Sequence, residues 1–159
     1  MKFSKEITIN ASAEKVWNII GLNFADVGKW DGAVSKSIIN KQATIVNGSP
    51  YGGRICETSF GKISEKFTAY DEAGMTFSFQ GDIKSPIFSN VISTNTVVTI
   101  DENTTKVIAT PNVDLKTLGF IMYPLIKAGL GSAVQKGLND LKHYAENDKL
   151  SPRKLASQK

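Results

Sequence analysis

The sequence of 159 residues contains one cysteine, one histidine and no long apolar run. Because Cys56 has no second cysteine for an intramolecular disulfide, we expect a reducing, cytoplasmic location. A membrane-spanning helix needs about 18 or more consecutive apolar residues, so we expect no integral membrane association. The N-terminal MKFSKEITI goes directly into a polar–apolar alternation, which predicts that there is no signal peptide.

Motifs for metals, nucleotides and nucleophilic catalysis are also lacking. The sequence has no zinc-ligand spacing, no P-loop, no GxGxxG and no Ser-His-Asp arrangement. We therefore expect no metal and no cofactor. His143 is expected to interact with the C-terminal dipole of the last helix. Cys56 is expected to be a small inward-facing residue and not a nucleophile.

Positive charge is concentrated at the C-terminus. Of the formal net charge of +4, the segment NDKLSPRKLASQK at 147–159 contributes +3, which leaves about +1 for the other 146 residues. Those residues contain no basic stripe interleaved with aromatic residues, so no nucleic-acid partner is expected. We expect a single domain over residues 1–147 and a basic, flexible tail over residues 148–159.

The order of the predicted elements indicates an α+β fold. A strand at 2–9 precedes two short helices that end near Trp30. Six segments rich in β-branched and aromatic residues follow between 34 and 114, separated by turn sequences. Apolar residues then recur at helical spacing from about 118 to 146, where Pro124 should kink the helix or mark its start. This order predicts an antiparallel sheet curled around a long final helix.

One strand carries a charge on its inward face. The segment KISEKFTAYD, residues 62–71, alternates polar and apolar side chains as a half-buried strand does. Glu65 lies on the apolar face, between Ile63 and Phe67. A buried carboxylate without a partner costs several kcal/mol or becomes protonated, so a partner is expected.

The preceding strand supplies that partner if the two strands form a hairpin. A turn at 58–61 places Arg54 opposite Glu65 on the inner face and Glu57 opposite Lys62 on the outer face. The inner pair has two interpretations. It is either a buried salt bridge that fixes the register, or a polar pair that orients a ligand or moves a proton inside an apolar cavity.

The final helix carries a line of small residues, and the next strand carries aromatic ones. Gly129, Ala133 and Gly137 recur every four residues and leave one line of the helix almost without side-chain volume. They allow either close approach of the helix to the sheet or space for a ligand. Phe77 and Phe79 lie on one face of the strand after the hairpin and would line the same space.

These features together resemble the START-like (SRPBCC) superfamily of helix-grip proteins, which includes polyketide cyclases and dehydrases, Bet v 1-like proteins and lipid-transfer domains. The resemblance is carried by ITINASAEKVWNII at 7–20, by Trp30, by GGRICETSFGKISEKFTAYDEAGMTFSF at 52–79 and by the helix that ends GLNDLKHYAEN. It implies a curved antiparallel sheet that grips the C-terminal helix, with a hydrophobic cavity between them.

The resemblance also implies a set of site residues and rim loops. The residues expected to contact a ligand are Arg54, Glu65, Phe67, Phe77, Phe79, Ile126, Gly129, Ala133 and Gly137. The loops NGSPYGG and DIKSPIF are expected at the rim of the cavity. The TSFG loop is short and the latch motif of the plant hormone receptors is absent, which argues against a receptor role. A single histidine likewise excludes the metal-centred oxygenases among the relatives.

Three functions remain open at this stage. The first is binding of a small hydrophobic ligand (a lipid, isoprenoid or polyketide-like molecule) by a monomer or weak dimer. The second is a cyclase or dehydratase in which Glu65 acts as general acid/base and Arg54 stabilises an enolate or carboxylate. The third is an interaction protein whose cavity is incidental, because a fold does not determine a function.

Overall fold

The computed structural model describes residues 1–83 and 85–158; Lys84, in the predicted loop DIKSPIF, and Lys159, at the end of the predicted tail, lie outside the described residues. Within that part of the chain, one antiparallel sheet has seven strands in the order β1-β7-β6-β5-β4-β3-β2. The strands are β1 (Lys5–Ile9), β2 (Val34–Ile39), β3 (Gly53–Thr58), β4 (Gly61–Asp71), β5 (Thr76–Asp82), β6 (Phe88–Asp101) and β7 (Thr104–Leu115).

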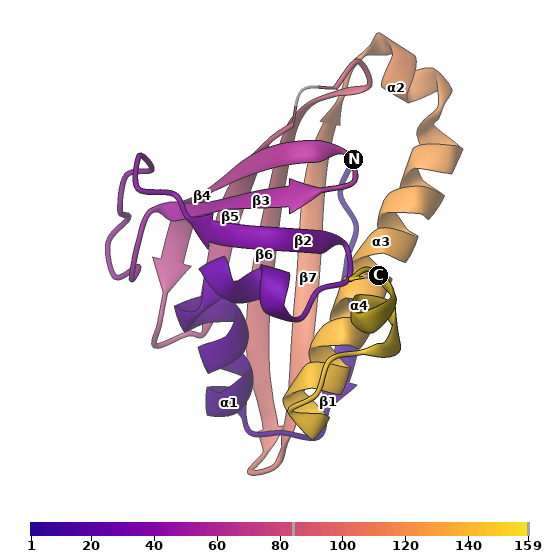
Figure 1. Ribbon diagram of the computed structural model, residues 1–159. Coiled ribbons are helices and arrows are strands. Elements are labelled where there is room, and N and C mark those ends of the chain that lie inside the picture. Colours follow the sequence, from indigo (N-terminus) through magenta and orange to yellow (C-terminus); the bar gives the residue numbers. More distant parts are fainter. Residues whose placement is uncertain (84, 159) are drawn as a thin grey trace.

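The helices lie before β2 and after β7. The first group is α1 (Ala13–Trp17), a wider π-type turn (Asn18–Leu22) and a 3₁₀ segment (Phe24–Lys29). The second group is α2 (Thr117–Ile121), α3 (Tyr123–Asn147) and α4 (Pro152–Ala156). Figure 1 shows α3 running along one side of the curved sheet, with α1 and α2 at opposite ends of the molecule. The predicted α+β, helix-grip architecture is confirmed.

Local sequence signals explain where two of these helices begin. The side-chain oxygen of Ser12 accepts a hydrogen bond from the Lys15 backbone N–H at 3.3 Å, which caps α1. Pro124 lies in the first turn of α3, where its missing N–H removes no helical hydrogen bond. Pro124 therefore marks the start of the regular helix, which is one of the two outcomes expected from the sequence.

The apolar core occupies the end of the molecule that contains α1. The buried residues there come from the N-terminal helices, from the inner face of the sheet and from the second half of α3; they include Val16, Trp17, Phe24, Phe67, Phe77, Val107, Leu138 and Leu141. The first half of α3 is different, since most of its side chains are exposed. A side-chain carbon added to Gly129 in this half would meet no atom of the described residues within 4 Å, so this glycine does not mark close approach to the sheet.

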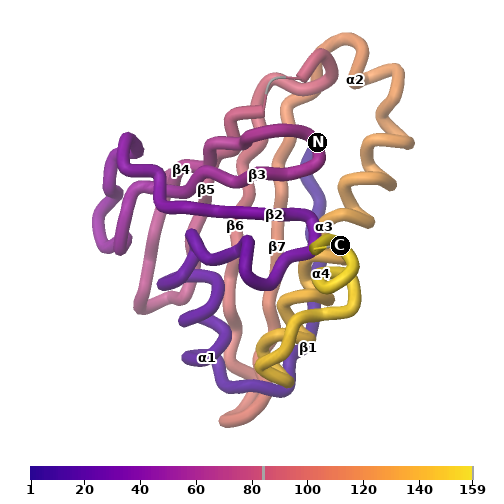
Figure 2. The backbone as a smooth tube through the Cα atoms, in the orientation of Figure 1, coloured from indigo at the N-terminus to yellow at the C-terminus, as the bar shows by residue number. Residues whose placement is uncertain are grey.

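The C-terminal segment is folded back on the domain. Its basic composition had predicted a flexible tail instead. After α3 the chain reverses, and α4 lies beside α3 (Figure 2). Ser151 caps α4 by accepting the Lys154 backbone N–H at 3.1 Å, and Pro152 occupies the first turn. The prediction relied on net basic charge and overlooked Ser-Pro as a helix-start signal. Lys154 is completely buried and donates to the Val34 carbonyl oxygen at 2.6 Å.

Candidate functional site

The hairpin of β3 and β4 has the register that charge matching predicted. Arg54 is directly opposite Glu65, and Glu57 is opposite Lys62. Gly61 ends the turn with φ of 104°, a left-handed conformation that glycine adopts without strain. The outer pair joins Lys62 Nζ to Glu57 Oε1 at 3.4 Å, with most of the lysine side chain in solvent. The register of the two strands therefore places Arg54 opposite Glu65 on the inner face. The same register places Glu57 opposite Lys62 on the outer face, in solvent.

Arg54 is held on three sides. Its Nε donates to Glu65 Oε2, and its Nη1 donates to the Phe24 backbone oxygen at 2.7 Å. The guanidinium carbon lies 3.6 Å from the centre of the Phe24 ring, which is a cation–π arrangement. Nη2 makes no hydrogen bond to any residue in 1–83 or 85–158. A buried guanidinium thus keeps one NH₂ group available to another molecule.

Glu65 is committed to Arg54 and lies beside a buried thiol. The Glu65 side chain is 16% exposed, and the Sγ of Cys56 lies 3.8 Å from its Oε2. Burial raises the pKa of Cys56 to about 12, so the thiol stays protonated near neutral pH. A protonated, buried thiol is a poor nucleophile, in agreement with the reading of Cys56 as an inward-facing small residue.

A cavity of about 270 Å³, partly open to solvent, lies between the inner face of the sheet and the second half of α3. Its walls are mainly apolar. Lining residues come from the N-terminal helical segments, from β3, β5, β6 and β7, and from α3; they include Ile20, Phe24, Trp30, Arg54, Phe77, Phe79, Val107, Ala133, Val134, Gly137, Leu138 and Leu141. The volume is near the lower end of the roughly 300–1,000 Å³ typical of small-molecule sites.

The structure separates the nine residues predicted from the sequence into two groups. Five of them line this cavity: Arg54, Phe77, Phe79, Ala133 and Gly137. The other four, Glu65, Phe67, Ile126 and Gly129, lie outside its lining. Phe67 packs against Phe24 with ring centres 4.5 Å apart, and Ile126 and Gly129 lie on the part of α3 before the cavity. A ligand contact from any of the nine stays a prediction.

Sequence reasoning missed a carboxylate on the cavity wall. Asp31 lines the cavity, and a side-chain carbon added to Gly137 would be 3.2 Å from its Oδ2. Asp31 accepts the Ala33 backbone N–H at 2.7 Å, and burial raises the pKa of its carboxyl group. Ser93 and Asn95 of β6 add two neutral polar side chains to the lining. In the sequence, Asp31 precedes glycine and has the pattern of an ordinary turn residue.

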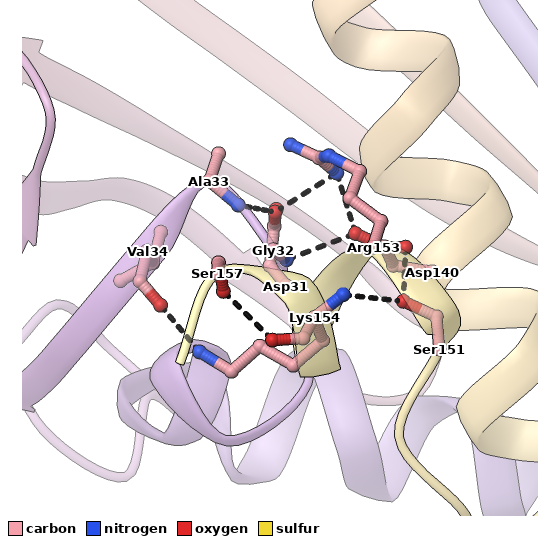
Figure 3. Close-up of polar contacts among 9 residues, drawn as sticks. All are labelled: Asp31, Gly32, Ala33, Val34, Asp140, Ser151, Arg153, Lys154 and Ser157. Carbon is pink, nitrogen blue, oxygen red and sulfur yellow. Dashed lines mark hydrogen bonds and ion pairs between the residues drawn. The ribbon is translucent and has the colours of Figure 1, made fainter. Parts of the chain in front are cut away.

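The C-terminal segment supports this polar wall (Figure 3). Arg153 Nη1 lies 3.4 Å from Asp31 Oδ1 and 2.5 Å from Asp140 Oδ2. Asp140 is 3% exposed, and it also accepts from the Gly32 backbone N–H at 2.9 Å and from the Ser151 hydroxyl at 2.5 Å. Each buried carboxylate therefore has hydrogen-bond donors. The segment that the sequence analysis treated as a tail contributes to the site.

Comparison with known proteins gives the family and relatives with the same fold. Residues 1–146 match the family model for polyketide cyclase/dehydrase and lipid transport. No curated protein matches the chain. A START superfamily protein from Mycobacterium smegmatis has a TM-score of 0.73 at 16% identity, covering 93% of this chain and 99% of its own.

Two enzymes of known structure share the fold at similarly low sequence identity. The Zhui aromatase/cyclase from a Streptomyces species has a TM-score of 0.69 at 12% identity, covering 95% of this chain and 99% of its own. The norcoclaurine synthase of Thalictrum flavum, solved as a point mutant with a transition-state analogue, has a TM-score of 0.65 at 19% identity, covering 91% of this chain and 93% of its own. At these identities the likeness concerns the fold. The match over residues 1–146 shows that the chain belongs to the polyketide cyclase/dehydrase and lipid transport family.

Proposed function

We propose that the chain binds a small, predominantly apolar molecule in the cavity between the sheet and α3, with a polar oxygen of that molecule at Arg54. Lipid, isoprenoid and polyketide-like molecules have this character. The carrying observation is the buried guanidinium on a mainly apolar wall, with Nη2 unused by the described residues. The pair with Glu65 and the stacking on Phe24 fix its orientation before a ligand arrives, which reduces the ordering cost of binding.

The catalytic alternative with Glu65 as general acid/base has less support. The Glu65 carboxylate is bound to Arg54 and lies outside the cavity lining, so a proton would have no direct path from it to a molecule in the cavity. The ionisable groups on the cavity wall are Arg54 and Asp31. The first anchors an acceptor oxygen, and the second faces α3 at Gly137 and can accept from a hydroxyl group of the same molecule.

A fluorescent probe with an aromatic body and a sulfonate, 8-anilinonaphthalene-1-sulfonate, tests this proposal directly. Ala133→Leu fills the cavity wall and is expected to weaken probe binding at least about tenfold, since the added carbons occupy the space of the probe. Ala128→Leu is the matched control, because Ala128 is exposed on α3 and does not line the cavity. Equal probe affinity in the native chain, A133L and A128L would refute binding at this cavity.

The polar end of the cavity needs a second variant that leaves no unpaired charge. Arg54→Gln together with Glu65→Gln neutralises both members of the pair, whereas either change alone would leave a buried charge. We expect the double variant to lower sulfonate-probe affinity about tenfold or more, the usual effect of losing a charge-assisted hydrogen bond. An uncharged probe of similar shape, N-phenyl-1-naphthylamine, should bind the native chain and the double variant alike. Unchanged sulfonate affinity would show that Arg54 is not the anchor.

A further inference from the structure

Six apolar side chains are exposed together where α2 meets α3. Phe120, Ile121 and Leu125 are 68%, 76% and 71% exposed. The whole group, which we call the α2–α3 crest, consists of Leu118, Phe120, Ile121, Met122, Tyr123 and Leu125. Single exposed apolar residues are normal on a protein surface, but a contiguous group of this size marks an interaction site.

The crest is held in place from below by backbone contacts. Gly119 is the buried residue of α2, and a side-chain carbon there would be 2.2 Å from the Ile87 backbone oxygen. The Lys116 backbone N–H donates to the same oxygen at 2.9 Å, and Lys116 Nζ donates to the Ser85 backbone oxygen at 2.8 Å. Because the glycine side of α2 faces the sheet, the large apolar side chains of this short helix are directed outward.

The charge within the segment that forms the crest and the first part of α3 has one sign. From Lys116 to Asn139 the sequence contains three lysines and no aspartate or glutamate, and Lys116, Lys127 and Lys136 are all exposed. Lys127 Nζ lies 5.9 Å from the centre of the Tyr123 ring. Lys127 also lines a hollow between β1 and α3 together with Lys5. An apolar and aromatic centre whose own segment, 116–139, carries only lysines as charged residues is complementary to an anionic lipid surface.

We propose that the α2–α3 crest docks on the surface of an anionic lipid bilayer. Aliphatic and aromatic side chains of the crest enter the boundary between headgroups and acyl chains, while the lysines approach lipid phosphates and carboxylates. No helix in the described residues is long and apolar enough to cross a membrane, so the contact is peripheral. The crest is at the end of the molecule away from α1, and docking there leaves the core undisturbed (Figure 1).

A second copy of the chain fits this surface less well. A two-fold symmetric contact would bring the lysines of both crests together without a carboxylate between 116 and 139 to neutralise them. An anionic bilayer supplies the negative charge that the crest itself lacks. The proposal does not depend on the ligand of the cavity, although a lipid surface would be a source of apolar ligands.

Vesicle co-sedimentation at low salt tests the proposal. The native chain is expected to bind vesicles of phosphatidylcholine with about 30 mol% phosphatidylserine at least tenfold better than pure phosphatidylcholine vesicles. Raising the salt to about 0.5 M should weaken this binding severalfold, since surface charges are then screened. The crest variant Phe120→Ser/Ile121→Ser/Leu125→Ser should lose at least tenfold in binding. These side chains are exposed, so its circular dichroism spectrum and melting temperature should match those of the native chain.

The control variant also removes three exposed apolar side chains, but from a different part of the surface. Ile38, Ile39 and Ile45, in β2 and the loop after it, are 52%, 46% and 63% exposed. Changing all three to serine should leave vesicle binding unchanged. The proposal is overturned if the native chain fails to bind anionic vesicles, or if both triple variants bind as the native chain does. A sedimentation coefficient that falls from dimer to monomer in the crest variant would instead assign the crest to a second copy.

Discussion

Glu65→Gln is the most informative single change in the hairpin, because it removes the charge that compensates Arg54. The Arg54 and Glu65 side chains are only 10% and 16% exposed, so water replaces the lost carboxylate poorly. Breaking a buried pair by removing one partner typically costs about 3–5 kcal/mol. Arg54 would keep the Phe24 carbonyl and the Phe24 ring, which places the expected loss near the lower limit, about 3 kcal/mol.

The assay is equilibrium urea unfolding. With an m-value of about 2 kcal/mol/M, a loss of about 3 kcal/mol lowers the urea midpoint by about 1.5 M. Glu57→Gln is the matched control, since Glu57 faces Lys62 in the same hairpin with 42% and 74% of their side chains exposed. That change should cost at most about 1 kcal/mol.

A double variant separates lost charge compensation from lost packing. Arg54→Met together with Glu65→Leu replaces the pair by apolar side chains, and such replacements are often neutral or better. We therefore expect the double variant to be more stable than Glu65→Gln alone. A Glu65→Gln midpoint within about 0.5 M of that of Glu57→Gln would contradict the account, because it would mean that the inner pair is as well solvated as the outer one.

Three further predictions concern the C-terminal segment and the thiol. Burial lowers the pKa of Lys154 below its usual 10.5, so the unfolded chain binds the extra proton and stability should rise as the pH approaches 10.5. The free energy of unfolding of Lys154→Met, measured from urea curves, should not show this rise with pH. An equal rise in the native chain and in the variant would contradict the prediction. Ser151→Ala removes the cap of α4 and a donor to buried Asp140, so we expect a loss of about 1–3 kcal/mol by thermal unfolding, and no loss would mean that α4 does not pack as described. Cys56 should react with a disulfide reagent such as Ellman's reagent at pH 8 only after unfolding in urea, since it is 2% exposed and its pKa is raised to about 12; fast reaction of the native chain would exclude a closed core here.

The hairpin was predictable because its constraints are local. Period-2 alternation fixed the inward face of β4 as far as Phe67, where a register shift interrupts it, and matching of opposite charges selected the register in which Arg54 meets Glu65. A one-residue shift would have turned every side chain to the other face, so the pattern carried enough information to choose. The order of strands and the long final helix followed from periodicity in the same way.

The cavity wall was not predictable to the same degree, because it depends on how α3 lies against the sheet. The line of small residues on α3 allowed either close approach to the sheet or space for a ligand, and the structure places only Ala133 and Gly137 of that line on the wall. A side-chain carbon added to Gly129 would meet no atom of the described residues within 4 Å. Sequence periodicity gives the face of a helix and not its tilt.

Asp31 and the C-terminal segment were missed for a related reason. Asp31 has the sequence pattern of a turn, and only the position of α3 brings it to Gly137. Arg153 reaches Asp31 across 122 positions of the chain, and no local pattern reports such a contact. The Ser151–Pro152 start of α4 was the one readable signal, and the prediction, which used only the basic composition, overlooked it.

The central claim is that the cavity beside Arg54 holds a small apolar molecule with a polar group. Native mass spectrometry of the chain purified from its own organism tests it most directly, with Ala133→Leu and Ala128→Leu produced in the same cells. The account predicts a non-covalent adduct of one small molecule on the native chain and on A128L, and its loss from A133L. A native chain without any adduct, or an adduct retained equally by A133L, would contradict the claim.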